Sequence, residues 1–255
     1  MRGFLALLLF LVCGPVLARQ VVKVGGYEFA PFVERSAGGP VSGLTLAFIE
    51  ALNRHQDRFA FEFVLTSPNR RYADFEARKF DVMFFESPDW GWQAHTTPVD
   101  ASRVFLTGGE QYIALAKPGR GQDYFRDFGR KRMVGMLGYH YGFAKFEADP
   151  VTLARTYRMT LVNDTAASIE LILKERGDVA VVTDAYLKRY LRQHPDAASR
   201  LLISQHFDQP YSHRILVRPD GAISAGEVNT LLDAMEADGT LSGLWRASGI
   251  LDAAP

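Results

Sequence analysis

Two carboxylates follow apolar runs that have the length of buried strands. Glu86 follows the run FDVMFF, and Asp184 follows VAVVT. A carboxylate that leaves a buried strand must be paired with a cation, bind a cationic ligand or hold a proton. For Glu86 the two hypotheses are a salt bridge with an arginine and a place opposite Asp184 around a ligand cation. For Asp184 the alternative is to cap the helix that follows.

Two adjacent arginines, Arg70 and Arg71, open a predicted helix. Positive charge in the first turn of a helix is unfavourable, so we expect at least one of them to have an anionic partner. That partner is either Glu86 or a ligand carboxylate, which a guanidinium can bind through two parallel hydrogen bonds. A solvated pair is the alternative. Arg103 is a weaker candidate, because it lies in a predicted edge strand.

Aromatic residues gather in the same loops as these charged residues. They are Tyr27, Phe29, Trp90, Trp92, Tyr139, His140 and Tyr141. Cations bind to the faces of aromatic rings, so an aromatic wall beside carboxylates suits an amine-bearing ligand. Ordinary packing is the alternative for each ring.

The elements that must position these residues alternate between strands and helices. Residues 21–25, 59–65 and 80–85 have strand patterns, and residues 44–55 and 69–79 between them have helical patterns. This order predicts a parallel sheet with helices on both faces.

The same alternation then restarts. Strands are expected at residues 111–116, 132–137, 179–182 and 211–217, and helices at 166–176, 185–193, 225–237 and 241–247. Two α/β units without a flexible linker predict two lobes with a ligand site between them.

The lobes are expected to share two crossing segments, at residues 110–115 and 209–215. Lobe one then takes residues 19–111 and 211–255, and lobe two takes residues 112–210.

Composition excludes several classes of function. The 255 residues include 29 Lys+Arg and 29 Asp+Glu, so no strong field favours nucleic acid or an anionic membrane. One cysteine excludes a disulfide framework and a cysteine-based zinc site. The histidines show no helical pair spacing for a metal. We expect no metal and no cofactor.

The first 18 residues resemble a secretory signal peptide. Arg2 precedes an apolar run from Phe4 to Val12 that is short for a bilayer span, and Val16-Leu17-Ala18 suits a signal peptidase. We expect cleavage after Ala18 and a periplasmic location. An uncleaved N-terminal anchor is the alternative.

Five segments in order resemble the family 3 periplasmic solute-binding proteins of the amino-acid-binding type. They are VKVGGYEFAPF, SGLTLAFIEALN, RKFDVMFF, RGDVAVVTD and the C-terminal stretch from YSHRILV to GTLSGLW. The resemblance implies an α/β, two-lobed type II periplasmic-binding fold with two hinge crossings. It also implies a monomeric, non-enzymatic protein that closes around a small ligand and delivers it to a membrane permease or a sensor receptor.

The resemblance assigns roles to some pocket residues and leaves one role vacant. Phe29 stands at the family's ligand-flanking aromatic position, and Asp184 stands at the position that holds the ligand ammonium. The carboxylate-binding arginine is replaced by Gln93. Either Arg70 or Arg71 serves in its place, which we favour, or the ligand lacks that carboxylate and is a net cation.

The expected function is therefore capture of a small polar, amino-acid-like or amine ligand. The alternative on the same scaffold is a periplasmic enzyme of the cyclohexadienyl-dehydratase type, in which Glu86 would be the general acid.

Overall fold

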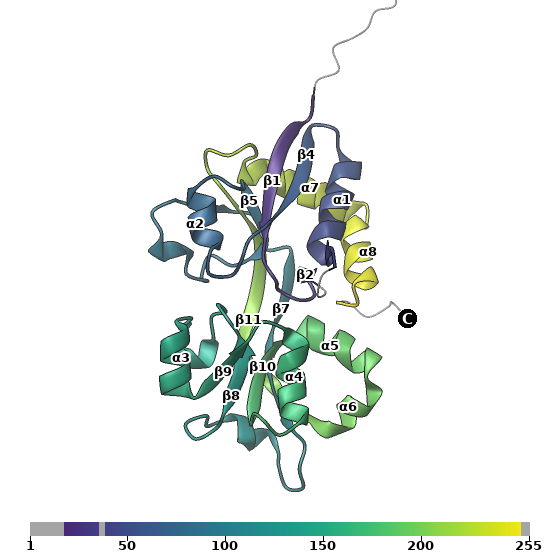
Figure 1. The fold of residues 1–255 in the computed structure, drawn as a ribbon. Helices are drawn as coiled ribbons and strands as arrows, with labels where there is room; N and C mark the ends of the chain where they lie inside the picture. The colour runs from purple at the N-terminus through teal and green to yellow at the C-terminus, as the bar shows by residue number, and fades with distance from the viewer. Residues whose placement is uncertain (1–17, 36–38, 251–255) are drawn as a thin grey trace, which may run out of the picture.

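Two long antiparallel strands, β7 (Leu106–Leu115) and β11 (Leu201–Val217), run between two α/β lobes (Figure 1). The computed structural model describes residues 18–35 and 39–250. The expected signal peptide lies outside the described residues, apart from Ala18. None of the helices in these two ranges is long and apolar enough to cross a bilayer.

Lobe one is built on a sheet in the order β4-β1-β5-β11, with β6 also paired to β11. Its strands are β1 (Gln20–Gly26), β4 (Phe59–Leu65), β5 (Val82–Glu86) and β6 (Asp100–Ala101), with a small β2 (Glu34–Arg35) and β3 (Val41–Ser42) hairpin beside it. β1 is parallel to both β4 and β5, as the strand-helix alternation predicts. The last residues of β11 pair antiparallel with β5.

Helices of lobe one come from both ends of the chain. They are α1 (Leu44–His55), α2 (Arg71–Glu76), α7 (Ala225–Ala237) and α8 (Thr240–Ala247), with a short 3-10 turn at Trp92–Ala94. α8 packs against α1, and the Trp245 ring lies 6.0 Å from the Phe48 ring. The C-terminal helices therefore complete the core of the N-terminal half.

Lobe two is built on a sheet in the order β11-β7-β10-β8-β9. Its further elements are β8 (Met133–Met136), β9 (Met159–Val162), β10 (Val179–Thr183), α3 (Pro150–Tyr157), α4 (Thr165–Leu173), α5 (Asp184–Gln193) and α6 (Pro195–Arg200), with 3-10 turns at Gln122–Phe125 and Gly142–Ala144. β8 is parallel to β9 and β10, and β10 is antiparallel to β7.

The main difference from the sequence prediction is the length of the crossing strands. β11 begins at Leu201 instead of residue 211, and β7 begins at Leu106 instead of residue 111. The first half of β11 contains Asp208 and Pro210, which disfavour strands. Pairing with β7 holds it extended despite that composition. β9, α3 and α6 were also not expected.

Candidate ligand-binding site

A small cavity lies between the two lobes, against the crossing strands. Its volume is only about 10 Å³, which is room for roughly one water. Its lining residues come from both lobes and both crossing strands: Tyr27, Phe29, Arg71, Trp90, Glu110, Gly138, Tyr139, His140, Gln209 and Tyr211. The lobes are therefore closed around this space.

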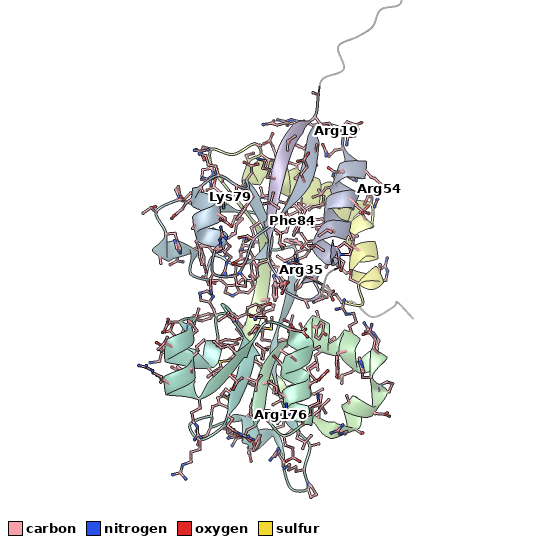
Figure 2. All side chains as sticks on the ribbon, viewed as in Figure 1. Arg19, Arg35, Arg54, Lys79, Phe84 and Arg176 are labelled. Atoms are coloured by element: carbon pink, nitrogen blue, oxygen red, sulfur yellow. The ribbon has the colours of Figure 1, made fainter. Side chains whose placement is uncertain are left out.

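Contacts between the lobes hold this closed arrangement. The Tyr139 hydroxyl donates to the Glu28 carbonyl at 3.0 Å. Arg189 on α5 binds both carboxylate oxygens of Glu34, at 2.6 and 2.5 Å. Outside the cavity, a wider groove of about 290 Å³ borders Arg35, which is labelled near the boundary between the lobes in Figure 2.

Gly138 is the point where lobe two touches the loop after β4, and alanine there is expected to hold the lobes apart. A Cβ at Gly138 would lie 2.6 Å from the Asn69 Oδ1 and 2.7 Å from the Pro68 Cβ. Gly119→Ala is the matched control, because its φ of 76° is close to the 78° of Gly138 but nothing lies within 4 Å. Both variants carry about 1–2 kcal/mol of backbone strain.

Small-angle scattering distinguishes the two variants. Gly138→Ala should increase the radius of gyration, whereas Gly119→Ala should leave it unchanged. Equal radii for the two variants would contradict the assignment of Gly138 as an interlobe contact.

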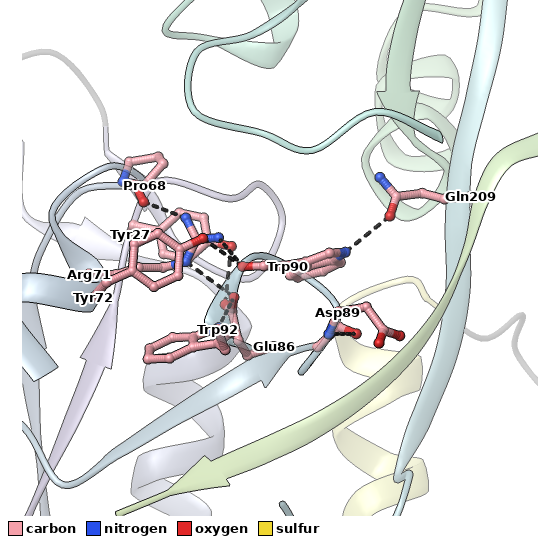
Figure 3. Close-up of polar contacts among 10 residues, drawn as sticks. Tyr27, Pro68, Arg71, Tyr72, Glu86, Asp89, Trp90, Trp92 and Gln209 are labelled. Carbon is pink, nitrogen blue, oxygen red and sulfur yellow. Dashed lines mark hydrogen bonds and ion pairs between the residues drawn. The ribbon is translucent and has the colours of Figure 1, made fainter. Parts of the chain in front are cut away.

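The guanidinium of Arg71 is held at the cavity wall by protein groups (Figure 3). Arg71 Nε lies 3.2 Å from Glu86 Oε1, although the N–H is not aligned for a hydrogen bond. One terminal nitrogen donates to the Pro68 carbonyl and the other donates to the Trp90 carbonyl at 3.2 Å. The guanidinium carbon lies 4.3 Å from the centre of the Tyr72 ring. Each nitrogen of Arg71 therefore faces a protein partner.

Glu86 is the counter-ion of Arg71, and it is fully buried behind the cavity wall. Trp92 Nε1 donates to Glu86 Oε1 at 2.9 Å, and the Tyr27 hydroxyl donates to Oε2 at 3.1 Å. Burial raises the pKa of the Glu86 carboxyl, and the neighbouring Arg71 charge is the main opposing influence. The salt-bridge hypothesis for Glu86 matches this geometry.

A β-bulge at Phe85 sets the direction of Glu86. In the pairing of β5 with β11, Glu86 lies opposite Arg214 and Met83 lies opposite Leu216. Two residues of β5 therefore stand opposite one residue of β11 between these pairs. Phe85 has a φ of 56°, a left-handed conformation that is strained for a bulky residue. Bulges often redirect side chains beside functional sites.

Glu110 is the second acid of the site, and it lies on β7 at the cavity wall with only 2% of its surface exposed. Gln209 Nε2 donates to Glu110 Oε2 at 3.2 Å. Burial, followed by the nearby Asp208 charge, raises the pKa of Glu110 to about 8, against hydrogen bonds from Tyr211 and Gln209. Glu110 is therefore mostly protonated at neutral pH.

Neither histidine beside the cavity supplies a positive charge. Burial and the Arg71 charge lower the pKa of His140 to about 4. Burial lowers the pKa of His213, which packs against the Tyr211 ring, to about 3. Among the described residues that line the cavity, Arg71 is thus the one cation, and Glu86 neutralises it. Glu110 has no cationic partner there.

Six of the candidate residues named from the sequence line the cavity. These are Tyr27, Phe29, Arg71, Trp90, Tyr139 and His140. Trp90 also reaches the crossing strand, because its Nε1 donates to Gln209 Oε1 at 3.0 Å. Three others are buried away from the wall: Glu86, Trp92 and Tyr141. The Tyr141 hydroxyl donates within lobe two to the Met136 carbonyl at 2.7 Å.

Two predicted residues are engaged elsewhere. The Arg70 side chain is 70% exposed and lies 3.6 Å from Asp74. Asp184 Oδ1 accepts the Gly109 N–H at 3.2 Å, and Lys188 lies 3.3 Å from its other oxygen. The structure does not bring Arg70 or Asp184 to the cavity. Thr183, not Asp184, is the N-cap of α5.

Besides Gly138, which has no side chain, sequence reasoning missed three side chains of the wall: Glu110, Gln209 and Tyr211. All three lie on the crossing strands. The available signal was their position in segments expected to pass between the lobes, since side chains there face both lobes. Within residues 18–35 and 39–250, no cluster of three or more His, Cys, Asp or Glu side chains is arranged to hold a metal ion.

Solved structures with the same fold include several amino-acid-binding proteins. A substrate-binding protein of an ABC uptake transporter from Streptococcus pneumoniae, with bound histidine, matches with a TM-score of 0.72 and 14% identity, over 92% of this chain and 94% of that chain. An ancestral arginine-binding protein bound to arginine matches with a TM-score of 0.67 and 19% identity, over 91% and 99%.

A third match is an ancestral amino acid-binding protein described as a precursor of cyclohexadienyl dehydratase. Its TM-score is 0.64 at 17% identity, over 89% of this chain and 95% of that chain. No protein-family model and no curated protein matches the sequence. The chain has the two-lobed α/β fold of these amino-acid-binding proteins, which confirms the fold that the sequence resemblance predicts.

Proposed function

We propose that this chain is a periplasmic solute-binding protein that closes its lobes around a small amine-bearing ligand. The observation that carries the proposal is the charge balance of the interlobe cavity. Arg71 is neutralised by Glu86, whereas Glu110 has no cation beside it. A ligand with one positive charge would pair with Glu110 once that carboxyl ionises, and the lobes would have to part to admit it, because the closed cavity has room for roughly one water.

The aromatic walls support the same class of ligand. Phe29 is central among them, with ring centres at 5.5 Å from Tyr139, 5.8 Å from Trp90 and 5.9 Å from Tyr211. Aromatic rings attract organic cations and exclude water, which strengthens attraction to a carboxylate. The fold and the amino acids bound by the matching structures agree with such a ligand.

A ligand carboxylate is an optional second group under this proposal. It would share the positive charge of the Arg71 guanidinium with Glu86, whose carboxylate lies 3.2 Å from Arg71 Nε. The hypothesis favoured from the sequence, in which the arginine binds a ligand carboxylate, is the competing form of the same function.

A thermal-shift screen over matched pairs separates these two forms. The pairs are L-alanine and ethylamine, L-lysine and cadaverine, L-histidine and histamine, and L-arginine and agmatine. We expect at least one of the decarboxylated amines to stabilise the protein, by about 2.7 kcal/mol at 100 times its Kd. Stabilisation by amino acids alone would support carboxylate binding by Arg71. Flat melting temperatures across all pairs would contradict the proposed function.

A dehydratase is the second candidate, and one observation favours it. Glu110 is a protonated acid on a cavity wall that also contains Arg71. In this form Glu110, and not the fully hydrogen-bonded Glu86, is the general acid. Incubation with prephenate tests it: aromatic product formed by the wild type and lost in Glu110→Gln would replace the binding proposal.

We propose that the ligand-bound protein, located in the periplasm, binds a membrane permease or a signalling receptor. The expected export signal and the likeness to an ABC transporter component support this.

A further inference from the structure

We propose that Glu110, and not Asp184, holds the positive charge of the ligand and releases one proton to solvent each time a cation binds. This inference rests on the proposed function of the cavity. In the step, the Glu110 carboxylic acid loses its proton to buffer, and the resulting carboxylate pairs with the ligand cation. For a ligand with one positive charge, such as ethylamine, the cavity therefore stays electrically neutral before and after binding.

The positions of the two acids favour Glu110. Its carboxyl lies at the cavity wall. It accepts a hydrogen bond from the neutral amide of Gln209 at 3.2 Å, and it has no cationic partner among the residues that line the cavity. Asp184 is outside that wall, and it already has Lys188 at 3.3 Å and the Gly109 N–H at 3.2 Å. A cation arriving at Asp184 would displace Lys188, whereas a cation at Glu110 displaces only a proton.

Gln209 links Glu110 to both lobes. Its Oε1 accepts from Trp90 of lobe one, and its Nε2 donates to Glu110 and to the His140 carbonyl of lobe two. The amide thereby fixes the Glu110 carboxyl against the aromatic wall. A ligand cation beside Glu110 is consequently also beside the rings that stabilise it.

Without a ligand, the groups around Glu110 favour its protonated form. Burial and the Asp208 carboxylate raise the Glu110 pKa to about 8. The other charged or titratable groups facing it across the strands and cavity are Tyr27, Tyr112, Tyr139, Tyr141, Tyr211, His140, the Arg71–Glu86 pair and the Asp184–Lys188 pair. The tyrosine pKa values are raised and that of His140 is lowered, so these side chains are neutral.

Proton release makes affinity depend on pH in a defined way. Below about pH 8 the site must lose a proton to bind, so the association constant should rise nearly tenfold per pH unit. Above that pH it should level off. Ethylamine, cadaverine and agmatine suit this measurement. The pKa of an alkyl amine is near 10.4, so these ligands stay cationic across the pH range in which Glu110 titrates.

Isothermal titration calorimetry with these three amines tests the inference. At pH 7, comparison of buffers with different ionisation enthalpies should show close to one proton released per ligand bound. In Glu110→Gln we expect no proton release, no rise of affinity with pH and a loss of affinity of about 30-fold or more. Asp184→Asn is the control, and it should keep the proton release and the pH dependence.

The outcomes separate this inference from the function on which it rests. A wild type that binds none of the three amines overturns both. Binding without proton release, or binding that Asp184→Asn removes and Glu110→Gln spares, overturns the role of Glu110 and leaves the cavity as the ligand site. Proton release by the wild type is measured without any variant, so the test does not depend on Glu110→Gln folding.

Discussion

Replacing Glu86 with alanine should lower the free energy of unfolding by about 3–5 kcal/mol, because it leaves the buried guanidinium of Arg71 without a counter-ion. Glu86 is fully buried and Arg71 is 1% exposed, so water cannot take the place of the lost carboxylate. The Trp92 and Tyr27 donors would lose their acceptor as well. Urea unfolding followed by tryptophan fluorescence measures the change.

The double variant Arg71→Met with Glu86→Leu is the matched control. Removing both charges together takes away the unpaired ion, so most of the lost stability should return, as for buried pairs replaced by apolar residues. A double variant that is less stable than Glu86→Ala would contradict the interpretation. It would mean that the hydrogen bonds of Glu86 and Arg71 to their other partners matter more than their mutual attraction.

Glu110→Gln should have the opposite effect and stabilise the protein, increasingly so as the pH rises. The pKa of Glu110 is about 8 in the folded protein against an ordinary value of 4.5. Between these pH values the folded state holds a proton that the unfolded state has lost, so folding becomes less favourable as pH rises. Glutamine does not ionise, so the variant avoids this loss of stability. At pH 8 its free energy of unfolding should exceed that of the wild type by about 3–5 kcal/mol.

Thermal unfolding at pH 4.5 and at pH 8 measures the effect. The variant and the wild type should differ little at the lower pH and most at the higher one. Glu175→Gln is the control, because this exposed carboxylate has its pKa lowered by Lys117. It should produce no such stabilisation at pH 8. A Glu110→Gln variant that is less stable than the wild type at pH 8 would contradict the raised pKa.

The elements with clear periodicity were predictable from the sequence. Helices α1 and α7 and strand β4 occupy the residues expected for them, because their apolar spacing matches one face of each element. The first half of β11 was not predictable in this way. Its polar residues are held extended by pairing with β7, which lies far away in the sequence.

The site was predictable where local sequence decides the position of a side chain. Phe29, Trp90, Tyr139 and His140 lie on loops that follow correctly expected strands, and they reach the cavity. Glu86 was identified as an unusual buried acid because an apolar run, FDVMFF, directly precedes it in the sequence.

The remaining site residues depend on the register between distant strands. Pairing of β7 with β11 places Glu110 opposite Gln209, and pairing of β10 with β7 places Thr183 opposite Glu110. The second pairing brings Asp184 to the Gly109 N–H. No local pattern contains this information, because each partner is far from the other along the chain.

The crossing strands also form part of the cavity wall, and this has a mechanical consequence. When two rigid bodies rotate about a shared axis, atoms near the axis move least. Glu110 and Gln209 lie on the strands that join the lobes, whereas Phe29 and Tyr139 lie on loops that belong to opposite lobes. Glu110 and Gln209 should therefore stay almost stationary when the lobes open, whereas Phe29 and Tyr139 should move much further apart.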